Sequence, residues 1–147
     1  MKLYFIARRT LLSENMNPIS YKETLEFKKD FKRLLKKFRS LEEDLELVKI
    51  ATIEPYHIGI LLNGVLEKKD ANAIFPIPNF CTEELKICKL KKFACKALKG
   101  RGVKSGIRII YAYCVLTKTV DFIEIYFKGE SENEDKERIK RYLASAT

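Results

Sequence analysis

The alternation of apolar and polar residues changes period along the chain and predicts helices first and strands afterwards. One helix face is expected from five apolar residues at helical spacing: Phe27, Phe31, Leu34, Leu35 and Phe38. Ser40 and Glu43 have the spacing of a capping box, so we expect a second helix to begin there and to stop before Pro55. A short strand over residues 20–25 should precede the first helix, and the two helices should form an α-hairpin.

Residues 55–84 show no regular period, and turn-forming pairs interrupt their short apolar stretches. We expect a long connection with one turn of hairpin, and connections of this length are uncommon unless they have a role. The single histidine, His57, falls here. A lone histidine is more often a packed or exposed ring than a general base, so the catalytic reading is the weaker one.

Three strands joined by short turns are expected in the second half of the chain. Residues 86–98 should be extended, residues 107–115 have the Ile, Tyr and Val content of a central strand, and residues 120–128 alternate cleanly. In the last of these strands the alternation should turn three residues away from the core: Glu124, Tyr126 and Lys128.

Ser131 and Glu134 repeat the capping-box spacing and predict a terminal helix. Its apolar stripe is expected to contain Ile139, Tyr142 and Leu143. Together the elements predict a compact α+β fold over residues 20–147. In that fold the α-hairpin packs on one face of an antiparallel sheet, a helix ends the chain, and the other sheet face is open.

Length and composition limit the class of protein. With 147 residues, 46% of them hydrophobic, the chain has apolar material for one core and needs no second domain. No apolar run reaches the roughly 18 residues of a spanning helix. The opening residues lack the apolar core and cleavage site of a secretory signal, so we expect a cytoplasmic protein. Residues 1–19 are assigned to an N-terminal extension or arm, with either Met1 or Met16 as the native start.

The cysteines do not have the spacing of a metal site. Cys81, Cys88, Cys95 and Cys114 form no Cys-x-x-Cys pair, and the chain has one histidine. We therefore expect no metal and no other cofactor, and we expect the cysteines to be small buried side chains.

Charge is concentrated in one stretch, which we call the basic strip and define as residues 85–108. It contains nine Lys or Arg residues and no Asp or Glu, against a net charge of +9 for the whole chain. Such a strip favours a polyanionic partner, because clustered cations raise the local concentration of phosphate groups.

Arg108 is the first candidate site residue, because a guanidinium at the start of a central strand can bind a phosphate in a bidentate manner. Four further residues are expected to complete a cationic pocket with one phenol: Lys92, Lys96, Tyr126 and Lys128. RNA-backbone contacts are expected from other cations of the basic strip, namely Lys89, Lys91, Lys99, Arg101 and Lys104.

A pocket of this kind suits RNA cleavage by the RNA's own 2′-hydroxyl without a metal. Cations stabilise the added charge on the phosphorane, and a Lys or Tyr can move protons. The alternative is that the same cations only bind a polyanion or an acidic peptide. Composition and spacing alone favour binding over catalysis.

The segment Gly106 to Tyr111 (GIRIIY) resembles the glycine-aromatic-Arg-apolar-apolar-Tyr signature of RelE/ParE-type toxins, with Ile107 in the place of the aromatic. Residues 92–102 and 124–129 are similar to a RelE-like subgroup of these toxins, and the resemblance covers residues 20–143. It implies the toxin of a type II toxin-antitoxin pair, neutralised by a cognate antitoxin. RelE-like members cut mRNA in the ribosomal A site without a metal, which would make the mRNA and the ribosome partners.

The resemblance also implies roles for individual residues. Arg108 matches the family's phosphate-stabilising arginine, Lys92 and Lys96 correspond approximately to its strand lysines, and Lys128 lies near its second cationic position. The family's catalytic tyrosine lies in the terminal helix, where this chain has only Tyr142 on an apolar stripe, so Tyr126 is the candidate substitute.

Three functions therefore remain open from the sequence. They are an mRNA endonuclease toxin that inhibits translation, a ParE-like gyrase inhibitor that is not a nuclease, and a basic binding module without toxicity.

Overall fold

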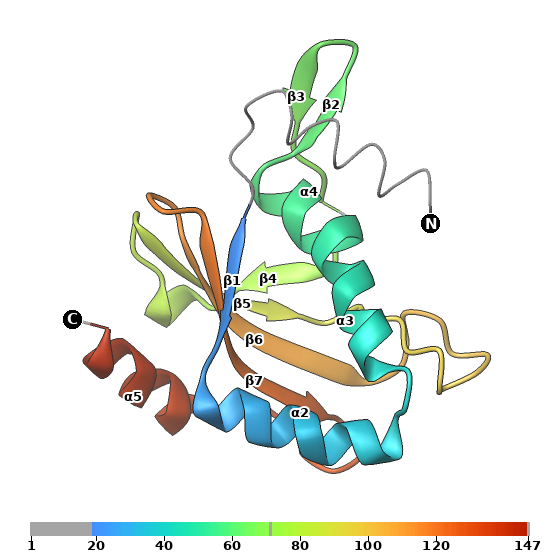
Figure 1. Cartoon of the computed structure of the whole chain (residues 1–147). Helices are drawn as coiled ribbons and strands as arrows, with labels where there is room; N and C mark the ends of the chain where they lie inside the picture. The colour runs from blue at the N-terminus through green and yellow to red at the C-terminus, as the bar shows by residue number, and fades with distance from the viewer. Residues whose placement is uncertain (1–18, 71, 147) are drawn as a thin grey trace.

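The computed structural model describes residues 19–70 and 72–146. Its elements in chain order (Figure 1) are β1 Ser20–Glu23, α2 Leu25–Lys37, α3 Leu41–Val48, a π-helical segment Lys49–Ile53, α4 Glu54–His57, β2 Ile60–Leu62, β3 Val65–Glu67, β4 Ile74–Pro76, a 3₁₀ turn Pro78–Phe80, β5 Leu85–Leu90, β6 Ile107–Cys114, β7 Thr119–Phe127 and α5 Lys136–Ser145. The expectations for the N-terminal arm fall almost entirely outside the described residues.

The fold is α+β, as expected. A five-stranded sheet has the order β1-β7-β6-β5-β4, and β2 and β3 form a separate two-stranded hairpin. All neighbours in the large sheet are antiparallel except β1, which runs parallel to β7. The sheet is therefore mixed, not antiparallel throughout as was predicted, because β1 and β7 run in the same direction.

The predicted α-hairpin packs on one sheet face, which we call the helix face (Figure 1). The Thr24 side chain caps α2 by accepting a hydrogen bond from the Phe27 amide at 3.2 Å. Phe27 and Leu34 are fully buried in the helix-face core. The helical spacing read from the sequence thus gives the correct buried stripe.

The predicted capping box is wrong, although α3 does follow Ser40. The Ser40 hydroxyl donates to Asp44 Oδ2 at 2.7 Å and accepts from the Ala97 amide at 2.8 Å, so it does not cap the helix. A loop distant in sequence binds the serine and the buried Asp44 instead. Glu43 is left on the surface, where it pairs with Lys96.

The helical segment does not stop before Pro55, and that expectation is also wrong. A π-helical segment over Lys49–Ile53 leads directly into α4, which includes Pro55. Pro55 lies in the first turn of α4, where the amide proton that proline lacks is least needed. The helical region therefore continues as far as His57.

The connection between the helices and β5 contains the expected hairpin, with its turn at Asn63 and Gly64. It also supplies β4, an edge strand that the sequence did not predict. The prediction of extended structure over residues 86–98 is wrong beyond Leu90. Residues 91–106 form a long loop rather than a short turn, because Phe93 and Cys95 pack into the helix-face core and pull the chain off the sheet.

The second sheet face is partly covered rather than open. A β-bulge between Ile110 and Tyr111 puts Ile123 on this face, together with Ile110, Ala112 and Tyr126. α5 packs here through Ile139, and its Arg138 reaches Asp30 of α2 at 2.5 Å. The prediction that Glu124, Tyr126 and Lys128 face away from the core is therefore wrong for Glu124 and Tyr126, which are buried, while Lys128 is exposed.

α5 begins later than its predicted capping box. Its N-cap is Asp135, whose carboxylate accepts from the Arg138 amide at 3.1 Å, and Ser131 lies in the preceding turn. The predicted stripe of Ile139, Tyr142 and Leu143 does pack against the second face. Over residues 19–70 and 72–146, no helix has both the length and the apolar content to cross a membrane.

Candidate functional site

Arg108 and Tyr126 lie directly opposite each other on β6 and β7. The strand containing Arg108 starts from a turn at Gly106, which has a φ of 84°. A Cβ at this glycine would lie 3.3 Å from the Phe127 ring, so both the backbone angle and the space favour glycine. The turn thus fixes the point at which Arg108 enters the second sheet face.

Three lysines gather around this pair on the second face. Lys89 Nζ lies 5.9 Å from the centroid of the Tyr126 ring, and Arg108 Nη1 donates to the Lys91 carbonyl at 2.6 Å. Lys128 follows β7, and its amide donates to the Gly106 carbonyl at 2.9 Å. Strand alternation places its side chain on the face of Tyr126. We call Lys89, Lys91, Arg108 and Lys128 the basic cluster.

Lys92 and Lys96 are not on the strand that was expected to present them. Lys92 is an exposed residue of the 91–106 loop. Lys96 lies beside α3, where its ammonium group pairs with Glu43 at 3.4 Å and its amide donates to Asp44. Lys96 therefore lies beside the helical layer and not beside Arg108. The lysines near Arg108 and Tyr126 are Lys89 and Lys91 instead.

The remaining cations of the basic strip are also in the loop. Lys99, Arg101 and Lys104 are all exposed, away from any strand. Lys104 is held by an isolated bridge to Phe93, and its amide donates to the Arg101 carbonyl at 2.9 Å. They form a charged edge of the molecule rather than part of the basic cluster.

Tyr126 is buried, with a relative exposure of 3%. Its hydroxyl has no hydrogen-bond partner within the described part of the chain. Burial raises the pKa of this phenol, and the nearby Lys89 only partly opposes the shift. The Tyr126 ring therefore lies beneath the basic cluster, and its hydroxyl is shielded from solvent.

An ion pair covers the Tyr126 ring. Lys89 Nζ lies 2.8 Å from Glu134 Oε2, and the two side chains keep only 15% and 11% of their exposure. Although burial lowers the pKa of Lys89, its hydrogen bond to Glu134 gives a net rise, so the lysine stays protonated. Glu124, a buried residue of β7, accepts a hydrogen bond from the Asp135 amide at 2.9 Å. The segment before α5 is thereby held against the sheet.

The other cations of the basic cluster lack acidic partners. Within the described ranges, no carboxylate lies within ion-pair distance of Lys91, Arg108 or Lys128. Glu130, the acid nearest to Lys128 in sequence, pairs instead with Arg33 and Lys37 of α2. The cluster is therefore a net positive surface, as phosphate binding requires.

An exposed aromatic ring that the sequence did not identify borders the basic cluster. Phe75 on β4 keeps 38% of its exposure, and Lys91 Nζ lies 4.5 Å from its centroid. Phe75 pairs in register with Lys89, which puts both on the second face. An aromatic ring among cations is the usual means of stacking a single-stranded base. The surrounding turn-rich sequence carried no strand signal that would have placed it there.

The side chains of the cluster are not those that ligate metals. No group of three His, Cys, Asp or Glu side chains over residues 19–70 and 72–146 could hold a metal ion. The four cysteines are free, with Cys88 and Cys95 buried. What the cluster can do chemically is bind phosphate oxygens and stabilise negative charge on them.

Comparison with known proteins gives one weak structural similarity. No protein-family model matches the chain, and no curated protein matches it. A crystal structure of an archaeal RelE–RelB complex from Pyrococcus horikoshii OT3 is similar with a TM-score of 0.45 and 11% sequence identity. The match covers 78% of this chain and 100% of that one. At these values the function of this chain has to be inferred from its own residues.

Proposed function

We propose that this protein is the toxin of a type II toxin-antitoxin pair and a ribosome-dependent mRNA endonuclease that needs no metal. The observation that carries the proposal is the part of the basic cluster formed by Lys91, Arg108 and Lys128, which lack acidic partners among the described residues. Arg108 contacts the Lys91 backbone, and Lys128 is bonded to the turn at Gly106 from which the Arg108 strand starts. The sequence resemblance to RelE-like toxins supports it. Its partners would be a cognate antitoxin and ribosome-bound mRNA, in the cytoplasm.

The proposed reaction is a transfer within the RNA. The 2′-oxygen attacks the adjacent phosphorus, the bond to the 5′-oxygen breaks, and the products are a 2′,3′-cyclic phosphate and a 5′-hydroxyl. Arg108 would stabilise the extra negative charge on the phosphorane, because its guanidinium can donate two parallel hydrogen bonds. Lys128 and Lys91 would hold the flanking phosphates.

The two proton transfers need a group that loses and gains a proton. Tyr126 remains the candidate, since it lies opposite Arg108 in the sheet. Its hydroxyl is buried under the Lys89–Glu134 pair, so this role requires the segment before α5 to move away from the ring. The ribosome-bound substrate would have to drive that movement.

Burial of the Tyr126 hydroxyl favours a second candidate function, RNA binding without cleavage. The basic cluster and the exposed Phe75 would suffice for it, because neither has to transfer a proton. Binding alone would slow translation by occupying mRNA, and it would leave transcripts intact.

Induced expression in bacteria, with mRNA integrity and plasmid supercoiling measured in the same culture, tests the proposal. Cleavage predicts growth arrest with loss of full-length transcripts and normal supercoiling. Arrest with intact transcripts and altered supercoiling would contradict it in favour of gyrase inhibition. Intact transcripts with normal supercoiling would leave the binding function.

A further inference from the structure

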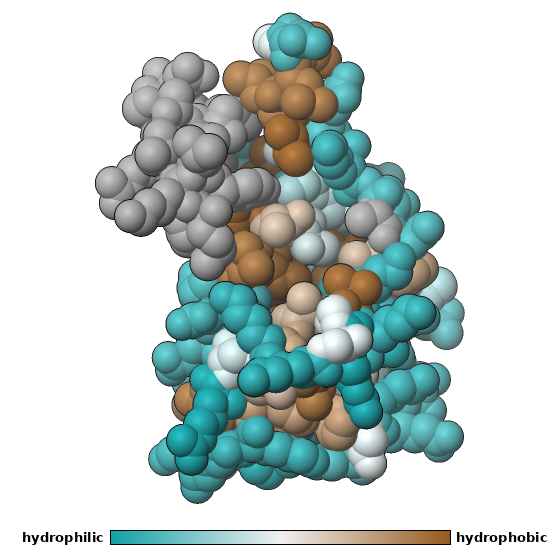
Figure 2. Space-filling view, turned by 90° about the vertical axis from the view of Figure 1, so that its right-hand side faces the viewer, coloured by the Kyte–Doolittle hydropathy of each residue, from teal (hydrophilic) through white to brown (hydrophobic). Residues whose placement is uncertain are grey.

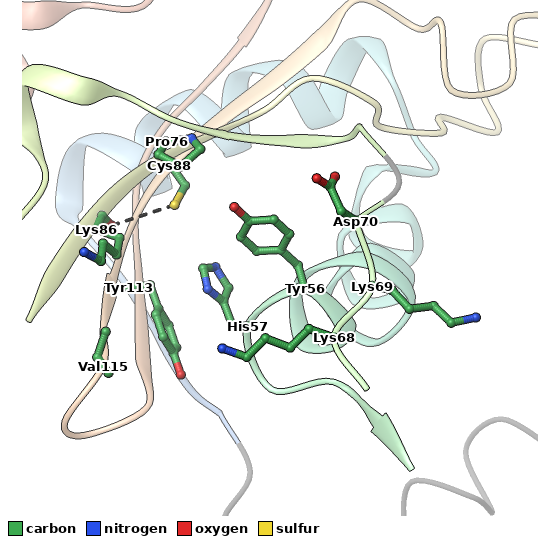
Figure 3. Close-up of a pocket in the computed structure, with 10 residues that line it drawn as sticks. All are labelled: Tyr56, His57, Lys68, Lys69, Asp70, Pro76, Lys86, Cys88, Tyr113 and Val115. Carbon is green, nitrogen blue, oxygen red and sulfur yellow. Dashed lines mark hydrogen bonds between the residues drawn. The ribbon is translucent and has the colours of Figure 1, made fainter. Parts of the chain in front are cut away.

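A pocket of about 410 Å³ lies on the helix face of the sheet, whereas the basic cluster lies on the second face. Figure 3 shows the side chains that surround it, among them Tyr56, His57, Lys68, Asp70, Lys86 and Tyr113. Its volume is within the usual range for small-molecule sites, about 300–1,000 Å³. Neither the sequence resemblance nor the proposed RNA chemistry uses this pocket.

Aromatic rings form one wall of the pocket and hold one another in place. The His57 ring stacks on Tyr113 with 4.0 Å between centroids and meets Tyr56 edge-on at 4.8 Å. His57 Nε2 is hydrogen-bonded to the Tyr111 hydroxyl at 2.7 Å. A ring fixed by a stack and a hydrogen bond gives a rigid surface against which a planar ligand can lie.

One cation is directed into the pocket. Figure 3 shows the Lys68 side chain extending toward His57 and Tyr113, whereas Lys69 turns away. Lys86 is already engaged, since its ammonium group donates to the Thr82 carbonyl at 2.5 Å. Burial, with Lys68 adding to it, lowers the pKa of His57 to about 4, so the imidazole is neutral at pH 7. Lys68 is thus the positive charge beside the aromatic wall, and Asp70 adds a carboxylate to the lining next to Tyr56.

The long connection after the helical layer builds much of this pocket. α4 contributes Tyr56 and His57, the residues after β3 contribute Lys68, and β4 contributes Pro76. The same connection carries the β2–β3 hairpin, whose Leu61, Leu62, Val65 and Leu66 are exposed and form the brown surface at the top of Figure 2. The connection thus supplies side chains to a pocket, which a simple link between helix and strand would not do.

We propose that this pocket binds a small planar anion, an aromatic ring that carries one carboxylate or phosphate group. The ring would lie against His57 and Tyr113, and the anionic group would pair with Lys68. Because the His57 imidazole is neutral at pH 7, Lys68 rather than His57 would pair with the anionic group. The pocket does not depend on the basic cluster, because the sheet lies between the two.

The chain offers two direct reporters of occupancy. It has one histidine, so its proton NMR spectrum contains one imidazole Cε1–H signal, and it has tyrosines but no tryptophan, so tyrosine fluorescence can be followed. The whole protein would be titrated with AMP as the phosphate probe and benzoate as the carboxylate probe. Adenosine and inorganic phosphate test the ring and the anion separately.

Saturable binding of AMP, of benzoate or of both, with a shift of the His57 signal, is the expected result, and it identifies the anionic group. Adenosine and inorganic phosphate should bind at least about tenfold more weakly, since each lacks one of the two interactions. Lys68→Met should weaken binding at least about tenfold, and the matched Lys69→Met should change it less than about twofold. Arg108→Ala should leave it unchanged.

The proposal is overturned if neither AMP nor benzoate shifts the His57 signal saturably. It is equally overturned if Lys68→Met binds as well as the unmodified chain, or if adenosine or inorganic phosphate alone binds as tightly as the composite ligands. Because Lys68 is exposed, its replacement is not expected to unfold the protein. If the Arg108→Ala variant lost RNA cleavage, the conclusion about ligand binding in this pocket would not change.

Discussion

Arg108 and Tyr126 face each other across neighbouring strands, but they differ in access to solvent. The Arg108 side chain is half-buried at the end of the sheet and donates to the Lys91 carbonyl, whereas the Tyr126 hydroxyl is buried without a hydrogen bond. A phosphate can therefore reach the guanidinium without a conformational change. It cannot reach the phenol unless the Lys89–Glu134 pair separates.

Replacing Glu134 by Gln should both loosen this cover and destabilise the fold. The change leaves Lys89 partly buried without its carboxylate, which should lower the free energy of unfolding by about 1–3 kcal/mol in urea denaturation. RNA affinity should rise, because Lys89 becomes available to phosphate. Glu137→Gln is the matched control, since its pair with Lys140 is exposed and worth less than about 1 kcal/mol. Equal stability of the two variants would contradict the role given to Glu134.

Replacing Phe75 by Leu should reduce affinity for single-stranded RNA by about 1–3 kcal/mol, the usual loss for one stacked base. Phe75→Tyr should retain most of the affinity, because it keeps the ring. Filter binding to an oligouridylate at fixed salt measures both. Since Phe75 is 38% exposed, neither change should alter the unfolding midpoint greatly. An affinity of Phe75→Leu equal to that of the unmodified chain would exclude a stacking role.

The salt dependence of RNA binding should identify the phosphate contacts. Lys91→Ala and Lys128→Ala should each reduce the slope of log K against log salt by about 0.7, the value for one phosphate on a single strand. Lys32→Ala, on the exposed face of α2, should leave the slope unchanged. If Lys32→Ala changed the slope as much as the other two, binding would be diffuse rather than centred on the basic cluster.

Stability should fall in acid partly through His57. Its pKa is lowered by burial to about 4 from 6.5, so the unfolded chain binds more protons between these values. The free energy of unfolding should therefore fall as the pH drops from about 6.5 to about 4, by up to about 3 kcal/mol from this group. His57→Gln should show a smaller fall over the same window in urea denaturation. Identical pH profiles would rule out a neutral, buried His57.

The sequence predicted the helices and their buried faces better than the residues at which the helices begin. The spacing of Phe27 and Leu34 identified the buried face of α2, because helix burial leaves a period in the sequence. The capping box at Ser131 failed because Asp135, four residues later, caps α5 instead. The capping box at Ser40 failed because the serine hydroxyl binds the Ala97 amide, which is distant in sequence. Local patterns carry no information about such contacts.

The candidate site was predicted in part. Arg108 and Tyr126 were correctly expected to lie across from each other on neighbouring strands, since strand alternation and a glycine turn fix them locally. Lys96 was misplaced because Phe93 and Cys95 turn the chain into the helix-face core. Phe75 was not predicted because its strand is short and lies at the sheet edge.

The rate at which the Arg108→Ala variant cleaves RNA, compared with the rate of the unmodified chain, is the measurement that tests the central claim most directly. A defined transcript would be translated in a reconstituted bacterial system, and 5′-end mapping would follow cleavage by the unmodified chain, by Arg108→Ala and by Arg39→Ala. Arg39 is an exposed arginine on the turn between α2 and α3, so its replacement makes the same charge change away from the cluster. We predict that Arg39→Ala cleaves normally and that Arg108→Ala, folded by circular dichroism, loses at least about a hundredfold in rate. Equal cleavage by Arg108→Ala and the unmodified chain would contradict the account.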